Sequence, residues 1–200
     1  MTAVDWSAGE KVTAEKLLAM EVGHLVLPSA ATNINTTTTE TVFAQILIPA
    51  NVAEVGMCFR IKAWGAMAVT GTPTITVRLR VGNSATPTSN TQVAQTTALT
   101  VQSGVTNRLF IADTFMCCES IGAAGALNGP LKYKTSGILA GTAPYINDAA
   151  EITTVIDGTA SATVDTTAAA TYIQLTAQWS ASSASNIFLC KGVISEKLVG

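Results

Sequence analysis

Residues 74–81 read Thr-Ile-Thr-Val-Arg-Leu-Arg-Val. Apolar side chains occupy every second position, and polar or charged side chains occupy the positions between them. Successive side chains of a β-strand point to opposite faces of a sheet, so this alternation predicts a strand with one core face and one water-facing face. The flanking Gly71-Thr72-Pro73 and Gly82-Asn83-Ser84 are typical turn sequences. The expected core residues are Ile75, Val77, Leu79 and Val81.

Similar signals on both sides of this stretch predict further strands at 41–48, 57–64, 91–101, 108–118, 132–139, 151–156, 171–180 and 186–198. Alternate side chains of the segment at 57–64 point to opposite faces. One face carries Met57, Phe59, Ile61 and Ala63, and the other carries Cys58, Arg60, Lys62 and Trp64. In the segment at 171–180 Tyr172, Gln174, Thr176 and Gln178 oppose Ile173, Leu175, Ala177 and Trp179. The apolar positions in 108–118 are Leu109, Ile111 and the region of Phe115. An irregular loop is expected at Gly122–Pro130, where it could lie against a neighbouring subunit or form a flexible tip. Eight or nine strands without intervening helices predict an antiparallel sandwich or barrel.

The first 27 residues differ from the rest, which divides the chain into an N-terminal segment (1–27) and a β domain (28–200). Thr13 is a suitable helix cap, Glu15 suits the first turn, and Gly23 can end the helix. Apolar residues at helical spacing predict a short amphipathic helix between them. Such a helix either packs on its own domain or anchors the chain to another protein. The residues that would make the anchor contact are Trp6, Leu17, Leu18 and Val22.

Composition points away from several function classes. The 200 residues are 48% apolar and only 12% charged, and Thr, Ala and Ser fill the deficit. A surface poor in charge suits burial against neighbours, because interface cores exclude charged residues. The net charge of −2 and scattered basic residues do not predict a nucleic-acid-binding surface. We find no secretory-signal pattern and no apolar run that would span a membrane, so we expect synthesis and folding in a cytoplasm.

The residues that could carry chemistry are sparse. The one histidine, His24, follows the expected helix, where the helix dipole favours it. The four cysteines lack metal-site spacing, and we expect reduced, mostly buried thiols. The β-region carboxylates are Asp113, Glu119, Asp148, Glu151, Asp157 and Asp165. Pairs such as Asp148 with Glu151, or Asp157 with Asp165, could hold calcium, but no calcium-loop register supports this. We therefore expect no enzyme, metal or cofactor, and we expect Trp64 and Trp179 to pack in the core.

Three stretches resemble virion proteins of tailed bacteriophages. Residues 6–17 are similar to the W-x-A-G-x-x-x-T-A-x-x-L opening found on minor tail, fibre and head-fibre proteins. Residues 59–65 with 74–82, and later 175–180 with 184–186, resemble strands of jelly-roll domains in the same class. The resemblance implies a jelly-roll β-sandwich, often trimeric, displayed on a particle through its N-terminal segment.

Together these features predict a non-enzymatic virion protein that forms a homotrimer. The missing shaft of repeats favours a capsid decoration or head-fibre protein over a tail-tip protein. Its expected partners are other copies of itself and, through residues 1–27, the major capsid protein or another virion protein, with no nucleic acid and no membrane. The alternative is a tail-tip receptor- or glycan-binding module, and a hydrolase is the least favoured reading.

Overall fold

The computed structural model describes residues 32–136, 151–156 and 161–198, with the backbone alone described at Ser136 and 151–156. Its strands are β1 (Thr32–Ile34), β2 (Thr41–Ile48), β3 (Cys58–Ala68), β4 (Thr74–Gly82), β5 (Thr91–Gln95), β6 (Leu99–Thr100), β7 (Arg108–Ser120), β8 (Gly125–Asn128), β9 (Leu131–Ser136), β10 (Glu151–Ile156), β11 (Ala162–Val164), β12 (Thr171–Trp179) and β13 (Ile187–Leu198). A 3-10 turn, η1 (Pro87–Ser89), is the only helical element among the described residues. No helix in these ranges is long and apolar enough to cross a membrane.

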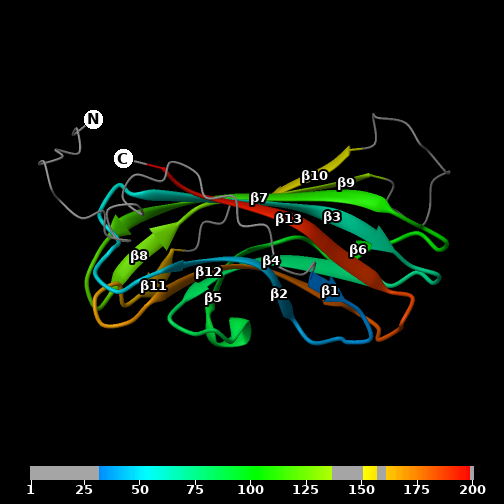
Figure 1. Cartoon of the computed structure of the whole chain (residues 1–200), viewed down its shortest axis with the longest axis horizontal. Coiled ribbons are helices and arrows are strands. Elements are labelled where there is room, and N and C mark those ends of the chain that lie inside the picture. The colour runs from blue at the N-terminus through cyan, green and yellow to red at the C-terminus, as the bar shows by residue number, and fades with distance from the viewer. Residues whose placement is uncertain (1–31, 137–150, 157–160, 199–200) are drawn as a thin grey trace, which may run out of the picture.

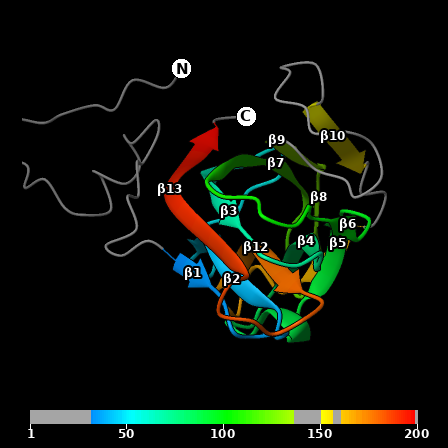
Figure 2. The same ribbon diagram turned by 90° about the vertical axis from the view of Figure 1, so that its right-hand side faces the viewer.

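The strands form two antiparallel sheets packed face to face as a β-sandwich (Figure 1). Sheet A follows the order β1-β13-β3-β7-β8-β11, and β9 and β10 continue from β7. Sheet B follows the order β2-β12-β4-β5, and β6 also pairs with β4. Viewed end-on, the two layers enclose the core between them (Figure 2). The fold is therefore all-β, as the sequence predicts.

Strands near the start of the described sequence pair with strands near its end. β1 pairs with β13, β2 with β12, β3 with β7 and β4 with β5, all antiparallel. Two further ladders, β13 with β3 and β12 with β4, link these pairs into the two sheets. The strands β8–β11 lie between β7 and β12 in the sequence and extend sheet A beyond β7. These four strand pairs therefore resemble one long hairpin that is folded across both layers.

The alternation at 74–81 is confirmed. The four apolar residues of β4 face the core and are fully buried: Ile75, Val77, Leu79 and Val81. The core face predicted for 171–180 is also confirmed, because Ile173, Leu175, Ala177 and Trp179 are buried. The two faces separated for 57–64 are confirmed as well, and the one that faces the core carries Phe59, Ile61 and Ala63. These strands were predictable because one face of each is continuously apolar.

An aromatic cluster joins the layers. The Phe110 and Phe188 rings of sheet A stack with centroids 4.1 Å apart, and Phe43 of sheet B lies 5.0 Å from Phe188. The Tyr133 ring stacks on Phe110 at 6.1 Å, and its hydroxyl donates to the Met67 sulfur at 3.5 Å. Burial raises the pKa of Tyr133, which therefore stays neutral in the core.

Three expectations about elements were wrong. The segment at 91–101 is divided into β5 and β6, and the Gly122–Pro130 stretch is not a loop throughout, because Gly125–Asn128 forms β8 between β7 and β11. The short strands β1 and β11 were not expected. A strand of three or four residues is too short to show a periodic pattern, so pairing with long neighbours defines it. The expected N-terminal helix lies outside the described residues.

The buried face of β4 leads to a stability prediction. Leu79→Ala should lower the free energy of unfolding by about 2–5 kcal/mol, because it leaves a cavity where the side chain is fully buried. The matched change Leu47→Ala, at a side chain that is 52% exposed, should cost less than about 0.5 kcal/mol. Urea denaturation followed by circular dichroism measures both, and equal costs would contradict the assigned faces.

Candidate functional site

The outer face of sheet A exposes apolar side chains along its central strand. Leu109, Ile111 and Phe115 of β7 are 64%, 38% and 41% exposed. The residues that alternate with them make the core face of this strand: Phe110, Ala112, Thr114, Met116 and Cys118. The apolar positions that the sequence analysis named for 108–118 are therefore on the side of β7 that faces water. Both faces of β7 are largely apolar, so its pattern could not reveal which one is buried.

Trp64 of β3 lies beside Ile111 in the register of the β3–β7 ladder. The expected core position of Trp64 is wrong, because its side chain is half-buried on the outer face of sheet A. The indole ring covers Gly192 of β13 so closely that a Cβ atom at Gly192 would overlap it. The absence of a side chain on Gly192 therefore lets the ring lie against the sheet. We call Trp64, Leu109, Ile111 and Phe115 the sheet A stripe.

Trp179 has the core position expected for it. It is 1% exposed, and its indole nitrogen donates to the carbonyl oxygen of Ile34 at 3.1 Å. This bond ties β12 of sheet B to β1 of sheet A.

A charged pair interrupts the sheet A stripe. The guanidinium of Arg60 donates to both carboxylate oxygens of Asp113, at 3.0 and 2.7 Å. Asp113 also lies opposite Lys62 on β3 and Lys132 on β9. Both lysines alternate with buried residues and so belong to the outer face. On its other side Arg60 lies opposite Glu196 of β13, whose charge also acts on it. Two carboxylates thus lie among three basic side chains, which leaves this part of the face with a small excess of positive charge.

The outer face of sheet B is different, because a polar network covers it. Glu40, just before β2, accepts from Arg80 at 2.8 Å with each of its oxygens, and from the Thr176 hydroxyl at 2.6 Å. Arg78 lies 3.5 Å from the same carboxylate and donates to Gln178 at 2.8 Å. The outward direction of Arg78 and Arg80 is as the sequence predicts, yet both side chains are largely buried.

The same network continues to the loop that carries η1. Gln174, fully buried, accepts from the Asn90 side chain at 2.8 Å and donates to the Ala85 carbonyl at 3.0 Å. Gln174 and Thr176 belong to the polar side of β12, so the alternation alone predicts that they are exposed. They are buried because Glu40 and the loop around Asn90, both remote in sequence, close over them. No buried side-chain nitrogen or oxygen among the described residues is without a hydrogen-bond partner.

Opposing effects determine the pKa of Glu40. Burial raises it, but the hydrogen bonds from Arg80 and Thr176 and the charges of Arg80 and Arg78 together outweigh burial. The pKa of Glu40 is therefore lowered below its ordinary value of 4.5. The carboxylate stays ionised at neutral pH and holds the two arginines against the sheet.

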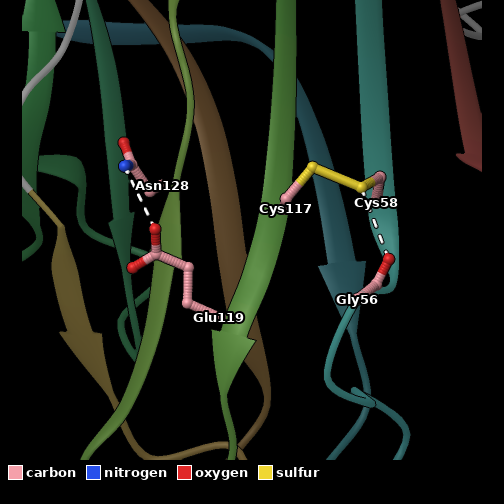
Figure 3. Close-up of a disulfide and its surroundings, with 5 residues drawn as sticks. All are labelled: Gly56, Cys58, Cys117, Glu119 and Asn128. Carbon is pink, nitrogen blue, oxygen red and sulfur yellow. Dashed lines mark hydrogen bonds between the residues drawn. A yellow bond between two sulfur atoms is a disulfide. The ribbon is translucent and has the colours of Figure 1, made fainter. Parts of the chain in front are cut away.

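The expectation of four reduced thiols is wrong at two positions. Cys58 and Cys117 lie directly opposite each other in the β3–β7 ladder, with Cα atoms 4.1 Å apart, and form a disulfide on the outer face of sheet A (Figure 3). Their pairing could not be recognised from spacing, because 59 residues separate them. Cys118 and Cys190 are buried free thiols, as expected. Burial raises the pKa of Cys190 to about 11 and also raises that of Cys118, so neither is reactive at neutral pH.

The candidate carboxylates have structural roles. Glu119 accepts from Asn128 at 3.3 Å (Figure 3) and from Ser161 at 2.8 Å. Asp165 accepts from the backbone of Thr167 and Ala168, which lowers its pKa. Asp148 and Asp157 lie outside the described residues, and of Glu151 only the backbone in β10 is described. Within the described ranges no three His, Cys, Asp or Glu residues are grouped so as to hold a metal ion.

The anchor residues expected from the sequence, Trp6, Leu17, Leu18 and Val22, lie outside the described residues, and so does His24. The surface that sequence analysis missed is the sheet A stripe. Its signal is present in the sequence, because three consecutive apolar residues, 109–111, cannot all face one side of a strand. No family model, curated protein or solved structure matches the chain at a significant level.

The Glu40 network predicts a pH-dependent stability. Because its folded-state pKa is lowered, Glu40 contributes stability that is complete above pH 4.5 and is lost as the pH falls through that folded-state pKa. Glu40→Gln should therefore destabilise the protein at pH 7 by about 3 kcal/mol, since two partly buried arginines lose their counter-charge. The deficit should shrink below pH 4.5.

Urea denaturation at pH 3 to 7 measures this difference. Glu54→Gln, at an exposed position in the β2–β3 loop, is the matched control and should behave like the parent protein. A deficit of Glu40→Gln that stays constant across this range would contradict the assigned role of the carboxylate.

The disulfide leads to a second prediction. Replacing Cys58 and Cys117 with alanine should cost about 2–4 kcal/mol, because the crosslink closes a long loop. A reducing agent should destabilise the parent protein by a similar amount and leave the double variant unchanged. Peptide mapping after alkylation of the folded protein should recover a Cys58–Cys117 linked peptide and unmodified Cys118 and Cys190. Alkylation of all four cysteines in the folded protein would contradict the pairing.

Proposed function

We propose that this chain is a non-enzymatic structural protein of a tailed-phage particle, a capsid decoration or head-fibre protein that assembles as a homotrimer. Its β domain would be a jelly roll, and residues 1–27 would attach it to the major capsid protein or another virion protein. The observation that carries the proposal is the pairing of the first strands with the last across both sheets, together with the motif at residues 6–17.

The strand order supports the jelly roll. In that fold a long antiparallel hairpin is rolled so that its two arms supply alternate strands to two facing sheets. The orders β1-β13-β3-β7 and β2-β12-β4-β5 have this form, if β8–β11 are taken as an insertion between β7 and β12. Jelly rolls are common in viral capsid proteins but also in lectins, so the fold alone does not specify the function.

Attachment through the N-terminal segment rests on its sequence. Residues 6–17 resemble the opening of many tailed-phage virion proteins, and Leu17, Leu18 and Val22 have the spacing of one helix face. A short helix with this apolar face and the nearby Trp6 side chain would bury its surface against a particle protein. Burial of such a surface contributes about 25 cal/mol per Å² before the cost of association.

Contacts between copies are supported by an apolar patch at one end of the sandwich. Val52 and Val55 in the β2–β3 loop and Ile121 after β7 are all exposed. Backbone hydrogen bonds hold these loops together: Gly56 N–H donates to Cys118 at 2.8 Å, and Thr166 accepts from Asn51 at 2.8 Å. Exposed apolar side chains on loops that are held together in this way suit the core of an interface.

The proposal predicts that removing residues 1–27 separates folding from attachment. The shortened protein should keep the β-type circular dichroism spectrum and a light-scattering mass of three copies, because the core and the end patch remain. It should no longer co-sediment with particles of the encoding virus that were produced without this protein. Full attachment after the deletion would contradict the anchor, and a mass of one copy for the full chain would contradict the trimer.

A further inference from the structure

The sheet A stripe is an apolar surface on a central strand, and nothing among the described residues covers it. Three of its four side chains belong to the exposed large hydrophobic residues of the protein. Sheet B, in contrast, has its outer face closed by the Glu40 network. An open apolar stripe flanked by polar residues is typical of a docking surface.

Charge indicates what kind of partner fits this stripe. Lys62 and Lys132 lie on both sides of Asp113, while the two carboxylates of this face, Asp113 and Glu196, both act on Arg60. Lys134 also belongs to this face, opposite Ile111. A second copy that docked by the same face would bring lysines against lysines, which is unfavourable. A partner that is both apolar and acidic complements the stripe and its lysines.

The chain itself contains such a partner. Residues 1–31 hold four acidic side chains against two basic ones, and they include the apolar residues of the expected anchor. The acidic residues are Asp5, Glu10, Glu15 and Glu21. This segment enters the fold at Thr32 in β1, which belongs to sheet A. Three strand spacings separate β1 from β7, about 14 Å, a distance that about five extended residues can span.

We propose that the sheet A stripe is the docking surface for residues 1–31 of the same chain. Apolar side chains of the segment cover Trp64, Ile111 and Leu109, and its carboxylates lie near Lys62 and Lys132. The free protein thereby shields both its apolar stripe and its N-terminal apolar residues from water. This inference goes beyond attachment to a particle, and it concerns the purified protein alone.

Photo-crosslinking of the full chain tests the docking. p-Benzoylphenylalanine replaces Leu109 on the sheet A stripe or, as the matched control, Leu47 on sheet B, because both side chains are more than half exposed. After irradiation, mass spectrometry of the monomer band should find residues 1–31 linked to position 109 at least about five times more often than to position 47. Equal yields at the two positions, or links from 109 mainly to residues 32–198 of a second copy, would overturn the proposal.

Charge reversal provides a second arm. Lys62→Glu with Lys132→Glu should lower the crosslinking yield at position 109 severalfold, because the carboxylates of the segment then face like charges. Adding Glu10→Lys and Glu15→Lys should restore the yield. Circular dichroism confirms that each variant is folded. A yield that does not respond to either reversal would overturn the assigned charge pairing. The crosslinking experiment contains no particles, so a negative result in it would not contradict the proposed attachment to a particle. A negative result in the attachment experiment would likewise not contradict the docking of residues 1–31.

Discussion

The structure depends on one constraint of β-strands: every second side chain must point away from the core. A two-layer sandwich buries only the inner faces, so each sheet has a second face that must be compatible with water or be covered. The inner faces here meet this constraint in the usual way, through the apolar positions of β4 and β12 and the stacked rings of Phe110 and Phe188. The two outer faces differ, and the difference between them is the most informative feature of the molecule.

Sheet B closes its outer face with a satisfied polar network. A single carboxylate, Glu40, holds Arg78, Arg80 and Thr176, and the loop around Asn90 completes the cover over Gln174. Such a network is stable only when every member is paired, since one missing partner leaves a buried charge or amide. The part of this face that the network covers is therefore committed to the fold, whereas Leu47 on the edge strand β2 stays exposed.

The sequence could predict the elements whose two faces differ in polarity. The alternation of β4 and of the segment at 171–180 predicted their core faces correctly. For 57–64 it separated the two faces but did not prevent Trp64 from being expected in the core. The alternation did not identify the core face of β7. Leu109, Phe110 and Ile111 are all apolar, so the odd-numbered and the even-numbered positions fit a core face equally well. It also could not foresee features made by residues remote in sequence, such as the Cys58–Cys117 bridge and the burial of Gln174. The anchor residues predicted at the N-terminus remain a prediction.

Sheet A differs from sheet B because its outer face is held rigid while staying open. Three kinds of cross-strand contact lie on this face: the Cys58–Cys117 disulfide, the diagonal Arg60–Asp113 pair, and the Trp64 ring over Gly192. All three fix β3 against its neighbours, β7 or β13. A surface that is already ordered has less conformational entropy to lose when a partner binds, so more of its apolar burial appears as affinity. A chain with only 12% charged residues has few other means of making such a face soluble. Its exposure is therefore better explained by a partner that covers it than by tolerance of water.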